Sequence, residues 1–175
     1  MKKLIARILI FALAVNLVAC GGAEAPQDTP APSDTTPVAE QQKPEEAYCF
    51  TLEGVKLIPG AAFDASLLPE ANDKFEVPSC AIEGTDDVYS YDAAEITAYN
   101  DGTGPVIYSI YLLDPNIPSE EGLLLGDEKA QVEALCGTDY QDMDGELVYT
   151  KGATELRIIL EEDLVVSIEY RMVTE

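Results

Sequence analysis

The chain has 175 residues, of which 33 are Asp or Glu and ten are Lys or Arg, so its formal net charge is −23. It contains no histidine, which excludes histidine-dependent triads, histidine-ligated zinc and imidazole proton shuttles. From residue 47 onward there are 27 acids and six bases, which makes nucleic acid a poor partner. This excess of negative charge can attract a cationic protein, peptide or polyamine. The alternative is that it only keeps the protein soluble.

The first 20 residues have the order of a secretory signal peptide. Lys2, Lys3 and Arg7 precede an apolar stretch over residues 4–15, and the sequence Leu-Val-Ala-Cys closes at Cys20. This ending resembles the lipobox of bacterial lipoproteins, which implies cleavage after residue 19 and acylation of Cys20. The alternative is an uncleaved anchor, but residues 4–19 are shorter than the about 20 residues of a spanning helix. We therefore expect a cell-membrane protein that is lipid-anchored on the extracytoplasmic face, with the bilayer as its first partner.

Residues 20–46 are predicted to form a linker that starts at the lipidated cysteine. From residue 21 to 46 there are five prolines, no aromatic residue and one branched aliphatic residue, Val38. Such a segment buries too little apolar surface to offset its chain entropy and is typical of disorder. We expect it to act as an extended spacer between the membrane and the folded part.

The remainder predicts an α+β fold in two similar modules, residues 47–117 and 118–175. Alternating apolar residues over 95–99 and 106–113 flank a turn that contains Asn100, Asp101 and Gly102, and this predicts a hairpin. A second hairpin is predicted from 155–160 and 164–170.

Each module should also contain one short helix packed on an antiparallel sheet of three to four strands. We expect the first helix at residues 61–68. The second should lie at 128–135, capped by Asp127 and ended by Gly137.

The two modules are interpreted as an internal repeat. Gly54 and Gly60 match Gly122 and Gly126, and residues 106–111 match 164–169. Tyr89 and Tyr91 lie where Leu147 and Tyr149 lie, whereas Glu95 and Ile96 are matched to Glu155 and Leu156.

This order of glycines, helix and three-stranded meander resembles small envelope lipoproteins. It is similar to the SmpA/OmlA and beta-lactamase-inhibitor-protein-like group, and to tandem two-module lipoproteins of Gram-positive envelopes. Residues 79–84 (Ser-Cys-Ala-Ile-Glu-Gly) and 87–91 (Asp-Val-Tyr-Ser-Tyr) carry most of the latter resemblance. The group implies protein binding or envelope assembly, no catalysis and no catalytic residue.

No cofactor is expected, and the acidic turn over residues 139–146 is the best metal candidate. Its residues Asp139, Asp142 and Asp144 suggest weak calcium binding, because calcium prefers several carboxylate oxygens around a turn. In an EF-hand spacing, Tyr140 and Lys151 would occupy the first and last ligand positions, and neither residue supplies a carboxylate. A helix-to-strand turn without metal is therefore favoured.

Three cysteines remain after Cys20, which is an odd number for an oxidising compartment. Cys49 and Cys80 are the preferred disulfide pair, with Cys136 in the core. The alternative is that all three are small buried residues. A thiol enzyme is not indicated, because no activating base is evident.

All nine tyrosines fall in the folded part. Four of them could share an exposed sheet face that recognises protein, namely Tyr89, Tyr91, Tyr99 and Tyr111. The alternative is that tyrosine is a good half-buried strand residue. The sequence thus favours a non-enzymatic protein that binds a protein or peptide at the envelope. An accessory role in envelope assembly or transport is the alternative, and a wall-directed enzyme has least support.

Overall fold

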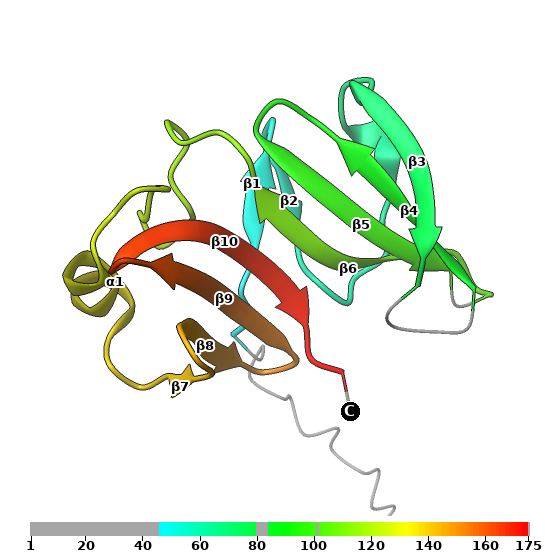
Figure 1. Cartoon of the computed structure of the whole chain (residues 1–175). Coiled ribbons are helices and arrows are strands. Elements are labelled where there is room, and N and C mark those ends of the chain that lie inside the picture. The colour runs from blue at the N-terminus through cyan, green and yellow to red at the C-terminus, as the bar shows by residue number, and fades with distance from the viewer. Residues whose placement is uncertain (1–45, 80–83, 101, 175) are drawn as a thin grey trace, which may run out of the picture. The chain divides into compact units, whose positions relative to one another are not determined.

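The computed structural model describes residues 46–79, 84–100 and 102–174, and these form an almost entirely β structure (Figure 1). The helical elements are a three-residue 3₁₀ turn, η1 (Ala65–Leu67), and α1 (Lys129–Cys136). The strands are β1 (Phe50–Leu52), β2 (Val55–Leu57), β3 (Asp73–Pro78), β4 (Thr85–Ser90), β5 (Ala94–Asn100), β6 (Pro105–Leu112), β7 (Gln141–Asp142), β8 (Glu146–Lys151), β9 (Thr154–Glu161) and β10 (Leu164–Met172).

Eight of these strands form one antiparallel sheet in the order β3-β4-β5-β6-β10-β9-β8-β7, and β1 and β2 form a separate hairpin. The expectation of two α+β modules, each a helix on its own sheet, is therefore wrong. The reason is the direct pairing of β6 with β10, in which Ile110 lies opposite Tyr170 and both side chains are completely buried. Long-range pairing merges the two meanders into a single sheet.

The helix predicted over residues 61–68 is also wrong. The backbone of residues 60–63 instead pairs with the first residues of β6, because Gly60 donates to the carbonyl of Ile107 and Phe63 to that of Pro105. Only η1 follows, capped by the side chain of Asp64.

The second helix exists within one residue of its predicted start, and Gly137 ends it at a φ of +85° that favours glycine. The predicted cap is wrong, since Glu128 occupies the N-cap. The carboxylate of Asp127 accepts instead from the N–H of Leu124.

One face of the sheet and the β1–β2 hairpin enclose the apolar core. Because side chains alternate along a strand, one row of each central strand enters this core. Phe50 of β1 stacks on Tyr170 with ring centroids 6.1 Å apart, which joins the hairpin to the sheet. The core residues that lie on the four central strands are Ala94, Ile96, Ala98, Ile107, Ile110, Leu112, Leu156, Ile158, Val165, Ile168 and Tyr170.

The same hydrogen-bond pattern occurs in both halves of the sheet. Gly60 donates to Ile107 and Ile107 to Ala61, while Gly126 donates to Val165 and Val165 to Asp127. Each following strand then has a register shift, after Ile107 in β6 and after Val165 in β10. Both halves thus use glycine at positive φ to bring a preceding loop against the last strand of a four-stranded meander.

Candidate binding surface

The structure divides the four predicted tyrosines between the two faces of the sheet. Tyr89 lies opposite Ile96 and Tyr91 belongs to the buried core, so both are on the core face. Tyr111 lies opposite Glu95 on the other face, and Tyr99 is on that face by alternation along β5. The four side chains therefore do not share one face.

The first pair is largely engaged in packing. Tyr89 meets Phe63 edge-on with centroids 5.0 Å apart, and the ammonium of Lys74 lies 4.8 Å from the Tyr89 ring centroid. Beside them is an open hollow of about 330 Å³. It is lined by Ala65, Leu68, Pro69, Glu70, Ala71, Lys74, Tyr89 and Tyr91. Tyr91 is only 8% exposed, so it acts in the core more than on a surface.

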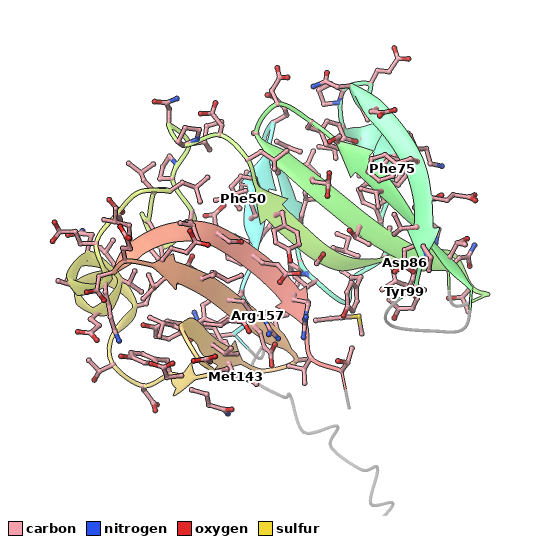
Figure 2. The ribbon with its side chains drawn as sticks, viewed as in Figure 1. Phe50, Phe75, Asp86, Tyr99, Met143 and Arg157 are labelled. Atoms are coloured by element: carbon pink, nitrogen blue, oxygen red, sulfur yellow. The ribbon has the colours of Figure 1, made fainter. Side chains whose placement is uncertain are left out.

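The second face carries a row of charged side chains that cross the central strands. Arg157 lies on β9 (Figure 2). It makes two hydrogen bonds of 2.6 Å to Glu146 on β8, and a third of 3.2 Å to Glu155. The bidentate geometry strengthens the pair. These contacts raise the pKa of Arg157, and the pKa of Glu146 is lowered chiefly by its hydrogen bonds with Arg157. The cluster is closed on itself, which suits a structural role.

The row continues onto β10 and β6 through Glu169 and Tyr111. Burial raises the pKa of Glu169, and Arg171 and Arg157 oppose this shift. Burial, with the neighbouring Glu169 carboxylate, raises the pKa of Tyr111 to about 12. Tyr111 therefore stays protonated at neutral pH, and burial disfavours the charged form of Glu169.

Two buried polar atoms lack a hydrogen-bond partner in the described part of the chain. They are Oδ1 of Asp86 on β4 and Nε of Arg171 on β10. The guanidinium of Arg171 lies 5.8 Å from the Tyr108 ring centroid, and this cation–π contact stabilises its positive charge.

Strand β3 forms one edge of the eight-stranded sheet, and sequence analysis did not identify it. Five of its six residues are exposed, including Phe75 at 42% (Figure 2). The alternation of Phe75 and Val77 with Lys74 and Glu76, closed by Pro78, was the available signal.

The predicted lipidation site Cys20 and the cysteine Cys80 both lie outside the described residues. Within the described residues Cys49 and Cys136 have free thiols, and the predicted pairing of Cys49 with Cys80 stays a prediction. Burial raises the pKa of both thiols, that of Cys136 to about 11. Both thiols are thus protonated at neutral pH and weak nucleophiles.

The acidic turn does not assemble into a metal site among the described residues, where no group of three or more acids, cysteines or histidines could hold an ion. Asp142 accepts from the N–H of Gly145 and lies 3.9 Å from Nζ of Lys129. Asp144 adopts a left-handed φ of +60° in the same turn, while Asp139 precedes β7.

No protein-family model, curated protein or solved structure matches the chain. The resemblance to envelope lipoprotein modules therefore stays a prediction. No helix in the described ranges is both long and apolar enough to cross a bilayer.

Proposed function

We propose that this chain is a lipid-anchored extracytoplasmic protein that acts by non-catalytic binding of a protein or peptide at the cell envelope. The anchoring part is supported by the charged start, the apolar stretch and Cys20 at the end of the lipobox-like sequence. Acylation at that cysteine would hold the folded part at the outer surface of a membrane.

The binding part is supported by how the few cations of the folded part are used. Lys74, Lys129 and Arg157 each lie within 4.0 Å of a carboxylate. Lys151 and Arg171 lie over tyrosine rings. With 27 acids against six bases from residue 47 onward, most carboxylates have no cation to pair with. This surface attracts a cationic protein and repels anionic polymers.

The test is cross-linking in intact cells that express the full chain, followed by fractionation and mass spectrometry. We expect the wild-type chain in the membrane fraction and Cys20→Ser in the soluble fraction. We also expect cross-links to a cationic protein that weaken when salt rises from about 0.05 to 0.5 M, because salt screens exposed charges.

Unchanged fractionation of Cys20→Ser would overturn the anchoring. Absence of any protein cross-link would overturn the binding role. A salt-resistant complex with a membrane-embedded protein would instead favour the accessory role in assembly or transport.

A further inference from the structure

The exposed edge of β3 is the part of the sheet best suited to contact a partner strand. Within the described residues β4 is its one neighbour in the sheet, and no backbone group outside the β3–β4 pair bonds to it. Such an edge is a template for adding another strand. We propose that β3 binds an extended cationic segment of a partner protein as a ninth strand. This inference rests on the proposed binding function and names its surface.

The register shows which backbone groups the edge offers. The N–H of Ser79 bonds to the carbonyl of Gly84, and pairing then continues without a shift from Pro78 to Asp73. In an antiparallel pair every second residue points its N–H and C=O away from the neighbour. Lys74 and Glu76 are therefore the residues whose backbone groups face outward. Pro78 falls in the same outward set, where a missing N–H breaks no bond to β4.

The side chains of β3 define what the added strand should carry. Phe75 is 42% exposed and lies opposite Val88 on one face, where an apolar side chain of the guest could pack. On the other face Glu76 lies opposite Asp87. A basic side chain of the guest would neutralise this pair of like charges. The edge thus fits a segment that alternates apolar and basic residues.

The one cation of the strand does not defend this edge. Lysine on an edge usually discourages strand addition. Here the ammonium of Lys74 lies 3.0 Å from the Asp87 carboxylate and over the ring of Tyr89, so it is directed toward β4. Asp73, Glu76 and Asp87 leave the local charge negative.

A second copy of this chain fits the edge less well than a cationic guest. Two β3 strands would bring acidic edges together in domains that each carry a large negative charge. The opposite end of the sheet offers no equivalent, since β7 has only two residues and turns at once into β8. The two meanders share their hydrogen-bond pattern, but the outer strand of the first, β3, has six residues and that of the second, β7, has two.

The experiment measures binding of a synthetic nine-residue peptide that alternates lysine and valine, with blocked ends, to the full chain in a neutral detergent. Its twin alternates glutamate and valine. Fluorescence anisotropy gives the Kd, and hydrogen exchange locates protection. We expect the lysine peptide alone to bind, with slower exchange at residues 73–77.

Two substitutions at one position separate strand pairing from charge. Glu76→Pro removes an outward N–H, whereas Glu76→Thr removes the same charge and keeps the N–H. We expect Glu76→Pro to weaken binding at least about fivefold relative to Glu76→Thr, as loss of one hydrogen bond implies. Phe75→Thr, which leaves all backbone groups, is expected to weaken binding as well. Near-ultraviolet circular dichroism and the melting temperature verify that each variant is folded.

Equal binding by Glu76→Pro and Glu76→Thr would overturn the inference, as would binding of the glutamate twin or no binding at all. Dimerisation of the full chain that Glu76→Pro abolishes would also overturn it in favour of self-association. If cells still yield the same salt-sensitive cross-links with Glu76→Pro, the proposed function stands and only the β3 inference fails. If wild type yields none, the proposed function itself fails.

Discussion

Tyr111 and Glu169 lie directly opposite each other where β6 pairs with β10, and their side chains are hydrogen-bonded at the middle of the sheet. The side chain of Glu169 is 8% exposed, and the rise in its pKa from burial outweighs the lowering by Arg171 and Arg157. The junction between the two meanders therefore contains an acid whose charged form is disfavoured by the fold.

This predicts a pH-dependent effect of Glu169→Gln. The pKa of Glu169 is raised above 4.5 in the folded protein, so the folded state holds the proton more tightly than the unfolded chain. Its contribution to stability is present at lower pH and decreases as pH rises from about 4.5 through the raised value. We expect the stability of Glu169→Gln relative to wild type to improve across that window. Melting temperatures between pH 4 and 8 provide the measurement, with Glu95→Gln on the same face as control. If the melting temperature of Glu169→Gln minus that of wild type stays constant or falls as pH rises, the assignment is contradicted.

Arg157 provides a second prediction, because three carboxylates depend on it. Its side chain is 14% exposed, and its guanidinium binds Glu146 and Glu155 and lies 4.0 Å from Glu169. Replacing it with Ala leaves these acids without their cation, and we expect a loss of about 3 kcal/mol in urea unfolding. Arg157→Lys keeps the charge but not the two-bond geometry and should lose less. Lys74→Ala removes an exposed ion pair and is expected to cost under about 1 kcal/mol. Similar losses for Arg157→Ala and Lys74→Ala would refute this ranking.

The comparison of sequence with structure separates local from long-range information. Both predicted hairpins are confirmed as β5–β6 and β9–β10, because alternation and turn residues act within about 20 residues of chain. The pairing of Ile110 with Tyr170 joins residues 60 positions apart, and no local pattern specifies it.

The candidate site shows the same limit. Tyr99 lies three residues from Ile96 in one strand, so alternation alone could have placed these two side chains on opposite faces. The face of Tyr89 depends on its register against Ile96, which only the folded sheet supplies. In the second half Leu147, the residue matched to Tyr89, lies opposite Ile158. Within the repeat Ile96 therefore corresponds to Ile158, and its match to Leu156 is wrong.

Removing the buried hydroxyl of Tyr170 is expected to destabilise the protein. This hydroxyl donates to Glu121 at 2.6 Å and accepts from the N–H of Glu120 at 2.9 Å. Burial raises its pKa strongly, so it stays protonated as a donor. In Tyr170→Phe the N–H of Glu120 loses its partner, and we expect about 1 to 3 kcal/mol of destabilisation. Tyr140→Phe, which removes a less buried hydroxyl bonded to Glu133, should cost less in the same denaturant titration. If Tyr170→Phe leaves the free energy of unfolding unchanged, water replaces the lost hydrogen bond.

The shared sheet predicts how the protein unfolds. Ile110 and Tyr170 have no exposed surface, and they pair across the only strand junction between the two meanders in the described residues. Truncating Ile110 to Ala removes apolar contacts from both meanders at once, and we expect a loss of about 2 to 5 kcal/mol. Because both meanders bury surface against this junction, they should melt together in one transition before and after the substitution. Differential scanning calorimetry tests this through the ratio of calorimetric to van't Hoff enthalpy. Two transitions in wild type, with only one lowered by Ile110→Ala, would show that each meander is stable without the other.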